Sequence, residues 1–214
     1  MSETEGESAA AGGAGDEINA RHREKMAKRK AARDRLMAQK TEERGLIIVH
    51  TGKGKGKSSA AWGMAARCIG HGYRIGIVQF IKGRGDTGEH LLFSRFPEQV
   101  TYKIMGEGFT WETQDRERDI AAAGAAWEES KKLMADPAIR MVILDELNIA
   151  LRYDYVDLED VLDTLAHKRP DLHVVVTGRN AAPELIDLAD LVTEMTLVKH
   201  PFREGVKSQP GVEF

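Results

Sequence analysis

Residues able to hold a nucleoside triphosphate gather in one short stretch of this sequence. Residues 51–59 read Thr-Gly-Lys-Gly-Lys-Gly-Lys-Ser-Ser, between an apolar run typical of a strand and a segment typical of a helix. Glycines let backbone N–H groups approach phosphate oxygens, and the helix that follows contributes the positive end of its dipole. The sequence therefore predicts a phosphate loop made of Thr51, Gly52, Lys53, Gly54, Lys55, Gly56, Lys57, Ser58 and Ser59.

Two side chains of this phosphate loop have the chemistry of a catalytic nucleotide site. Lys57 supplies a positive charge for the terminal phosphates, and the hydroxyl of Ser58 is placed to ligate Mg²⁺. The common pattern Gly-x-x-x-x-Gly-Lys-Ser/Thr has glycine where Thr51 stands here, so the loop is a variant of that pattern. A Gly- and Lys-rich surface turn is the alternative, but the flanking strand and helix favour a phosphate site.

A pair of acids is the second feature with chemical potential. Residues 141–144 are Met-Val-Ile-Leu, typical of a buried parallel strand, and Asp145 and Glu146 follow directly. At the carboxyl edge of a parallel sheet these carboxylates would face the phosphate loop and could bind Mg²⁺ or Mn²⁺. Neighbouring strand residues point to opposite sides, so the spacing leaves open which acid touches the metal. A solvated turn after the strand is the alternative.

The remaining metal-binding residue types do not form a site. The chain has one cysteine, Cys68, which excludes an internal disulfide, and its histidines are scattered without metal-ligand spacing. A dedicated transition-metal centre is therefore not expected.

The elements that position these residues alternate between strand and helix. That alternation predicts an α/β fold of the P-loop NTPase-like (RecA-like) class, with a mostly parallel sheet flanked by helices. The expected strands are residues 46–50, 74–80, 100–105, 141–144, 172–177 and 191–198, and the expected helices are residues 58–69, 114–135, 158–165 and 183–189.

The sequence before the first strand has a different composition. Residues 1–16 are an acidic Gly/Ala tail that we expect to be disordered, and residues 17–44 form a charged helix, ahead of a domain at 45–214. The helix holds ten Lys and Arg residues and five acidic residues. Three interpretations fit this composition: a solvated helix or linker, a basic flap over an anionic substrate, or a nucleic-acid arm. The absence of interleaved aromatic residues argues against the nucleic-acid arm.

Bulk composition narrows the setting. The net charge is −3, apolar residues make up 42% of the chain, and no apolar run approaches the length of a membrane helix. The N-terminus also lacks the pattern of a secretory signal. We therefore expect a cytoplasmic protein without a membrane partner.

The ordered motifs resemble one family, the P-loop corrinoid adenosyltransferases of vitamin B12 biosynthesis and salvage. The phosphate loop beginning with threonine is similar to that family's own version of the motif. The other matching segments are Gly70-His71-Gly72, Val78-Gln79-Phe80-Ile81-Lys82-Gly83, Gly108-Phe109-Thr110-Trp111, Leu144-Asp145-Glu146-Leu147 and Val198-Lys199-His200.

This resemblance implies an activity and its substrates. The enzyme would transfer the 5′-deoxyadenosyl group of ATP to the Co(I) centre of a corrinoid and release triphosphate. An electron-donating flavoprotein reductase and a homodimer are further expectations that come from the family.

The resemblance also implies roles for residues outside the phosphate loop. Phe109 and Trp111 would contact the corrin and help to exclude the lower ligand of cobalt, which makes them catalytic together with Lys57. Lys82 would lie at the corrinoid, and Arg67 and Gln79 at the nucleotide. For Phe109 and Trp111, packing in a loop is the alternative interpretation.

Two other functions use the same motifs. A P-loop kinase or ATPase would cleave the γ-phosphate with the same loop and acid pair. A nucleotide-dependent nucleic-acid binder would use the basic helix at 17–44, and it would show steep salt dependence.

Overall fold

The structure, a computed structural model, describes residues 8–81, 87–105 and 115–213. By its internal contacts the chain divides into two units, Met1–Glu43 and Arg44–Phe214. The predicted site belongs to the second unit.

In the described part of the first unit the chain forms one helix, α1, which spans Ser8–Ala38. It begins inside the segment that the sequence predicts to be disordered, because the alanines of that segment have high helix propensity. From Asp16 onward every side chain of α1 is exposed, and the helix carries i,i+4 ion pairs such as Arg21–Glu17 and Lys28–Glu24. None of the helices within the described ranges is both long and apolar enough to cross a membrane.

The second unit is built on a six-stranded sheet in the order β3-β2-β4-β5-β1-β6. All neighbouring strands pair in parallel, which confirms the predicted α/β fold. Parallel pairing brings the carboxyl ends of all strands to one edge, so the phosphate loop and the acid pair share that edge. The strands are β1 Ile47–Thr51, β2 Arg74–Gln79, β3 Val100–Ile104, β4 Ile139–Asp145, β5 His173–Thr177 and β6 Leu191–Glu194.

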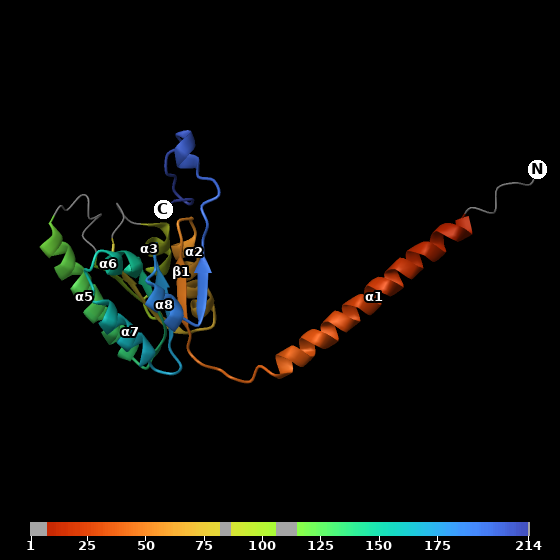
Figure 1. Cartoon of the computed structure of the whole chain (residues 1–214), viewed down its shortest axis with the longest axis horizontal. Coiled ribbons are helices and arrows are strands. Elements are labelled where there is room, and N and C mark those ends of the chain that lie inside the picture. The colour runs from red at the N-terminus through yellow and green to blue at the C-terminus, as the bar shows by residue number, and fades with distance from the viewer. Residues whose placement is uncertain (1–7, 82–86, 106–114, 214) are drawn as a thin grey trace, which may run out of the picture. The chain divides into compact units, whose positions relative to one another are not determined.

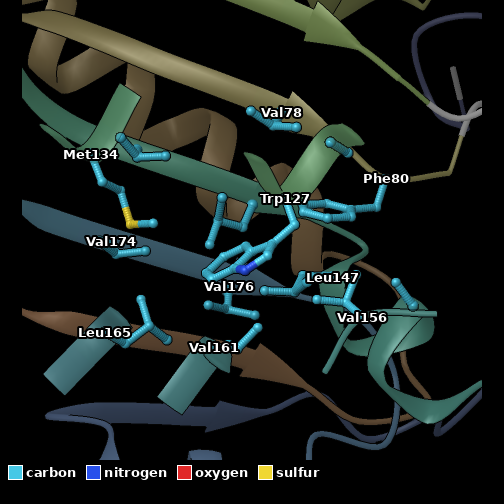
Figure 2. Close-up of a cluster of buried hydrophobic side chains, with 14 of the residues drawn as sticks. Val78, Phe80, Trp127, Met134, Leu147, Val156, Val161, Leu165, Val174 and Val176 are labelled. Atoms are coloured by element: carbon cyan, nitrogen blue, oxygen red, sulfur yellow. The ribbon is translucent and has the colours of Figure 1, made fainter. Parts of the chain in front are cut away.

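Helices cover both faces of this sheet, as Figure 1 shows for α2 on one side and α5 and α7 on the other. On the second face Trp127 of α5 is 3% exposed and lies among side chains of the sheet and of α7, including Val176 and Leu165 (Figure 2). The helices are α2 Lys57–Gly70, α3 Gly88–Phe93, α5 Arg116–Ala135, α6 Leu147–Arg152, α7 Leu158–Ala166 and α8 Pro183–Leu188, with a short 3₁₀ helix at Pro201–Glu204.

Three local features differ from the sequence prediction. Helix α3 begins in a segment for which the sequence predicted no helix, because the Thr87 hydroxyl accepts a hydrogen bond from the His90 N–H and caps it. Helix α6 was not predicted and starts directly after Glu146. Strand β6 ends at Glu194, opposite Thr51, and not at Val198 as predicted, because the neighbouring strand β1 ends at Thr51.

Candidate functional site

The phosphate loop connects β1 to α2 at the carboxyl edge of the sheet. Gly52 and Gly56 have φ angles of 95° and 105°, a conformation that glycine adopts without strain. Gly56 is the N-cap of α2, and no side chain caps this helix end. The first N–H groups of the helix therefore remain able to bind an anion, and the helix dipole favours negative charge there.

The loop backbone packs tightly against the residues that follow β6. The Gly54 N–H donates to the Met195 carbonyl at 2.6 Å, and the Met195 N–H donates to the Thr51 carbonyl at 2.8 Å. A Cβ atom at Gly52 would lie 2.5 Å from the Met195 oxygen, and one at Gly54 would lie 2.8 Å from it. Both glycines are therefore required by close backbone approach.

Thr51, which replaces the first glycine of the common motif, has a contact that glycine could not make. Its buried hydroxyl accepts a hydrogen bond from the Ala181 N–H at 3.1 Å. This bond joins the start of the phosphate loop to the segment after β5. The variant loop is thus tied to a neighbouring loop at the same edge.

Lys57 lies inside the site and not at its surface. It is 7% exposed, and its ammonium donates to the Gly54 carbonyl at 2.7 Å. Burial lowers the pKa of Lys57, and the nearby Glu146 carboxylate opposes this by favouring the charged form. A buried ammonium at the first residue of α2, held against the loop backbone, is suited to bind phosphate oxygens.

Asp145 and Glu146, together called the acidic corner, follow β4 beside this loop. Asp145 is 4% exposed, and both of its carboxylate oxygens are hydrogen bonded. Oδ1 accepts from the Thr177 hydroxyl at 2.8 Å, and Oδ2 accepts from the Gln79 amide at 3.0 Å. The structure therefore brings Gln79, predicted to bind ATP, into contact with Asp145.

Glu146 has an unusual backbone for a residue with a side chain. Its φ of 61° lies in the left-handed region, a costly conformation that recurs at functional sites. Burial raises the pKa of Glu146 to about 7, and the Asp145 carboxylate adds to that rise while Lys57 and Arg179 oppose it. Glu146, Lys57 and Arg179 therefore form a group of interacting charges beside the phosphate loop.

The other side chains of the predicted loop differ in their exposure. Ser58 is partly buried in the first turn of α2, whereas Lys53 and Ser59 are exposed, and the predicted role of Ser58 as a metal ligand remains a prediction. Lys55 is exposed and forms an ion pair with Glu213 near the end of the chain.

The structure does not bring Arg67 to the loop. This exposed residue lies in the last turn of α2, ten residues after Lys57, which corresponds to about 15 Å along the helix axis. Its predicted contact with the nucleotide remains a prediction. Lys82, Phe109 and Trp111, predicted at the corrinoid, lie outside the described residues.

Two residues that contact the candidate site were missed by sequence reasoning. Thr177 contacts the acidic corner, and Arg179 interacts with Lys57 and Glu146 through its charge. Both follow from the position of Thr177-Gly178-Arg179 at the carboxyl end of β5, since ligands of parallel sheets bind at that edge. The glycine at position 178, which marks the end of this strand in the sequence, could have pointed to Thr177 and Arg179.

The oxygen atoms of Ser58, Asp145 and Glu146 can be compared with the ligands that the expected metal ion prefers. Within the described ranges no three His, Cys, Asp or Glu side chains form a group that could hold a metal ion. Mg²⁺ needs no such cage, because it is usually held by one or two carboxylates, substrate phosphates and water. The hydroxyl of Ser58 and the acidic corner therefore fit Mg²⁺ or Mn²⁺ bound together with a nucleotide.

Comparison with known proteins agrees with this geometry. Residues 43–214 match the family model described as ATP:corrinoid adenosyltransferase BtuR/CobO/CobP, and residues 14–36 match the model of the N-terminal part of cob(I)alamin adenosyltransferases. The corrinoid adenosyltransferase of Pseudomonas aeruginosa is 57% identical over 198 residues, covering 92% of this chain and 98% of that protein.

A more distant relative covers the same extent. The corrinoid adenosyltransferase CobA of Salmonella typhimurium is 47% identical over 194 residues, which are 91% of this chain and 98% of CobA. The family model spans the sheet, the phosphate loop and the acidic corner, so the resemblance of the sequence motifs is confirmed. The chain therefore belongs to the ATP:corrinoid adenosyltransferase family of enzymes.

Proposed function

We propose that this protein transfers the 5′-deoxyadenosyl group of ATP to the Co(I) centre of a corrinoid and releases triphosphate. The observation that carries the proposal is the buried Lys57, held between the phosphate loop and the acidic corner in a chain of this family. The relatives named corrinoid adenosyltransferases support the acceptor class. The kinase or ATPase alternative has no such support.

The reaction asks little covalent chemistry of the protein. The electron pair of Co(I) forms the cobalt–carbon bond to C5′, the C5′–O bond breaks, and its electron pair leaves with the triphosphate. Negative charge therefore grows on the leaving group, where loop N–H groups and the Lys57 ammonium would stabilise it. Arg179 would add positive charge on the same side, since it interacts with both Lys57 and Glu146.

A divalent cation completes this site in the proposal. Ser58, Asp145 and Glu146 would hold Mg²⁺ or Mn²⁺, which supplies positive charge to the phosphates when bound. The Asp145 oxygens already accept hydrogen bonds from Thr177 and Gln79, whereas the structure assigns the Glu146 carboxylate no such bond within the described residues. Glu146 is therefore the better candidate for direct contact with the cation.

The corrinoid side of the site rests on the family resemblance. Phe109 and Trp111 would contact the corrin and exclude the lower ligand of cobalt, and Lys82 would bind at its edge. The acceptor would be cob(I)yrinic acid a,c-diamide, cobinamide or cobalamin. A flavoprotein reductase would supply the electron in the cytoplasm, and the working form would be a homodimer.

The decisive experiment is anaerobic incubation with ATP, Mg²⁺ and a chemically reduced corrinoid. We expect a light-sensitive cobalt–carbon product and stoichiometric triphosphate. Orthophosphate with ADP, and no alkylated corrinoid, would instead support a kinase or ATPase.

A pair of lysine variants ties the activity to the phosphate loop. Lys57→Ala should abolish product formation, because it removes the buried ammonium from the loop. Lys132→Ala, at a lysine that is 73% exposed on α5, should retain full turnover. Full turnover in Lys57→Ala would refute the site assignment.

A further inference from the structure

One buried hydroxyl group holds both residues of the acidic corner. We propose that Thr177 is a positioning residue, which keeps Asp145 and Glu146 in the conformation that binds the cation of a metal–ATP complex. The inference rests on the nucleotide-binding part of the function proposed above. It concerns a residue that does not itself touch substrate.

The two hydrogen bonds of Thr177 use the single donor of its hydroxyl and one of its two acceptor lone pairs. The hydroxyl donates to Asp145 Oδ1 at 2.8 Å and accepts from the Glu146 backbone N–H at 3.0 Å. Thr177 is 0% exposed, so water cannot replace either bond without a rearrangement. A single hydroxyl offers one donor, and here it is committed to a carboxylate that would face the cation.

The geometry of β5 makes this contact possible. Leu144 of β4 stands opposite Val176 of β5, so the next residues along the two strands, Asp145 and Thr177, are neighbours on one face. Gln79 of β2 stands opposite Asp145 on its other side and binds Oδ2. Asp145 is therefore oriented from both neighbouring strands, and its carboxylate cannot rotate freely.

Glu146 depends on the same hydroxyl for a different reason. Its left-handed backbone is costly for a residue with a side chain, and the hydrogen bond from its N–H to Thr177 helps to hold that conformation. Without this acceptor the N–H group would lack a partner in a partly buried setting, which favours a different backbone conformation. The direction of the Glu146 carboxylate would change with it.

The next residue leaves room for that carboxylate. Gly178 has a φ of 125°, and a Cβ atom there would lie 3.1 Å from Glu146 Oε2 and 2.8 Å from Asn148 Cβ. The carbonyl of Gly178 accepts a hydrogen bond from the Asn148 amide at 3.1 Å, which ties the end of β5 to α6. Thr177 therefore holds the acidic corner by hydrogen bonds, and Gly178 leaves the space that the Glu146 carboxylate occupies.

A merely structural threonine and a positioning threonine differ in what their loss does to metal binding. Loss of a group that orients a metal ligand typically costs about 10- to 100-fold in metal affinity. Binding of ATP without metal uses the phosphate loop and Lys57, which Thr177 does not contact in the described hydrogen bonds. The expected defect is therefore specific to the metal complex.

The test compares Thr177→Val, which removes the hydroxyl, with Thr177→Ser, which keeps it. Isothermal titration measures the affinity for ATP with Mg²⁺ and with EDTA, without corrinoid, and Mn²⁺ electron paramagnetic resonance reports the metal directly. Thr177→Val should weaken Mg²⁺–ATP binding by at least about tenfold and change metal-free ATP binding far less. Thr177→Ser should bind the metal complex like the wild type.

Controls separate positioning from loss of the fold. Thr101→Val makes the same chemical change on β3, away from the acidic corner, and should leave both affinities unchanged. Circular dichroism and urea unfolding show whether each variant is folded. If Thr177→Val does not fold, Thr177→Cys replaces it, because the thiol is of similar size but a weak hydrogen-bonding group.

Three results would overturn the inference. They are normal Mg²⁺–ATP binding in the variant without the hydroxyl, an equal loss of metal-free ATP binding, and a defect in Thr177→Ser as large as in Thr177→Val. The proposed function fails separately, if the wild type binds Mg²⁺–ATP but forms no alkylated corrinoid. In that case the positioning role of Thr177 would still stand.

Discussion

Replacing Glu146 by glutamine should make the protein more stable while it weakens the proposed metal site. In the absence of nucleotide and metal, the Glu146 carboxylate lies beside Asp145 in a partly buried position. Glutamine has nearly the same shape and no charge. The substitution therefore removes the unfavourable charge and leaves the packing unchanged.

The magnitude follows from the pKa of this group. The pKa rises from 4.5 to about 7 on folding, and each unit corresponds to 1.36 kcal/mol, so the full effect is about 3 kcal/mol. Because the folded-state pKa is the higher one, the native state favours the protonated acid. The stability that Glu146 contributes is fully present below pH 4.5 and is lost as the pH rises through 7.

Glutamine behaves like the protonated acid at every pH. Relative to the wild type, Glu146→Gln should gain about 1 kcal/mol at pH 5 and about 3 kcal/mol at pH 8 in the free energy of unfolding. Urea unfolding of the nucleotide-free protein at a series of pH values measures this difference. Glu117→Gln, at an exposed glutamate of α5, is the matched control and should show no comparable gain.

Two outcomes would refute this reasoning about Glu146. One is a stability difference that does not grow with pH, and the other is a variant less stable than the wild type at pH 8. The same variant should bind Mg²⁺–ATP more weakly, because it lacks a carboxylate at the cation. Stability traded for function is the expected pattern at a site that concentrates like charges.

Three further predictions concern Gly52 and Thr51 of the phosphate loop and the neighbouring Arg179. Gly52→Ala should lower the free energy of unfolding by about 2 to 5 kcal/mol, because the added Cβ would meet the Met195 carbonyl. The control Gly72→Ala, at a φ of 77° with open space around it, should lower that free energy by about 1 to 2 kcal/mol. Equal losses in urea unfolding would contradict the close approach. Thr51→Gly restores the common motif but removes the hydroxyl that accepts the hydrogen bond from the Ala181 N–H, so it should destabilise the protein by about 1 to 3 kcal/mol. Thr51→Ser keeps a hydroxyl and should not destabilise the protein. Differential scanning calorimetry of both variants checks this. Arg179→Ala should lower kcat/KM for ATP by about 100-fold with little change in melting temperature, because Arg179 is exposed and, in the proposed function, would stabilise the leaving triphosphate. Steady-state kinetics that match the wild type would remove it from the site.

Local sequence patterns were sufficient for the fold class and for the strand–loop–helix arrangement around residues 51–59. The apolar run of β1, the glycines and the amphipathic start of α2 are neighbours in sequence, so their chemistry is readable without any tertiary contact. The acid pair after β4 was readable for the same reason. Parallel pairing then requires both features to share one edge of the sheet.

Contacts between distant segments explain what sequence reasoning missed. The role of Thr51 depends on the Ala181 N–H, 130 residues away, and the orientation of Asp145 depends on Gln79 and Thr177 from neighbouring strands. The left-handed backbone of Glu146 has no sequence signature at all, since glycine is the residue that normally adopts it.

One physical reason separates the features that were readable from the sequence from those that only the folded chain reveals. Helix and strand propensities and phosphate-binding turns depend on residues within a few positions of each other, so a single sequence carries them. Which strand lies beside which, and therefore which side chain orients the acidic corner, depends on the register of non-local pairs such as Leu144 with Val176. Only the folded chain brings the Thr177 hydroxyl to both acids, because those partners are 31 and 32 residues away along the chain.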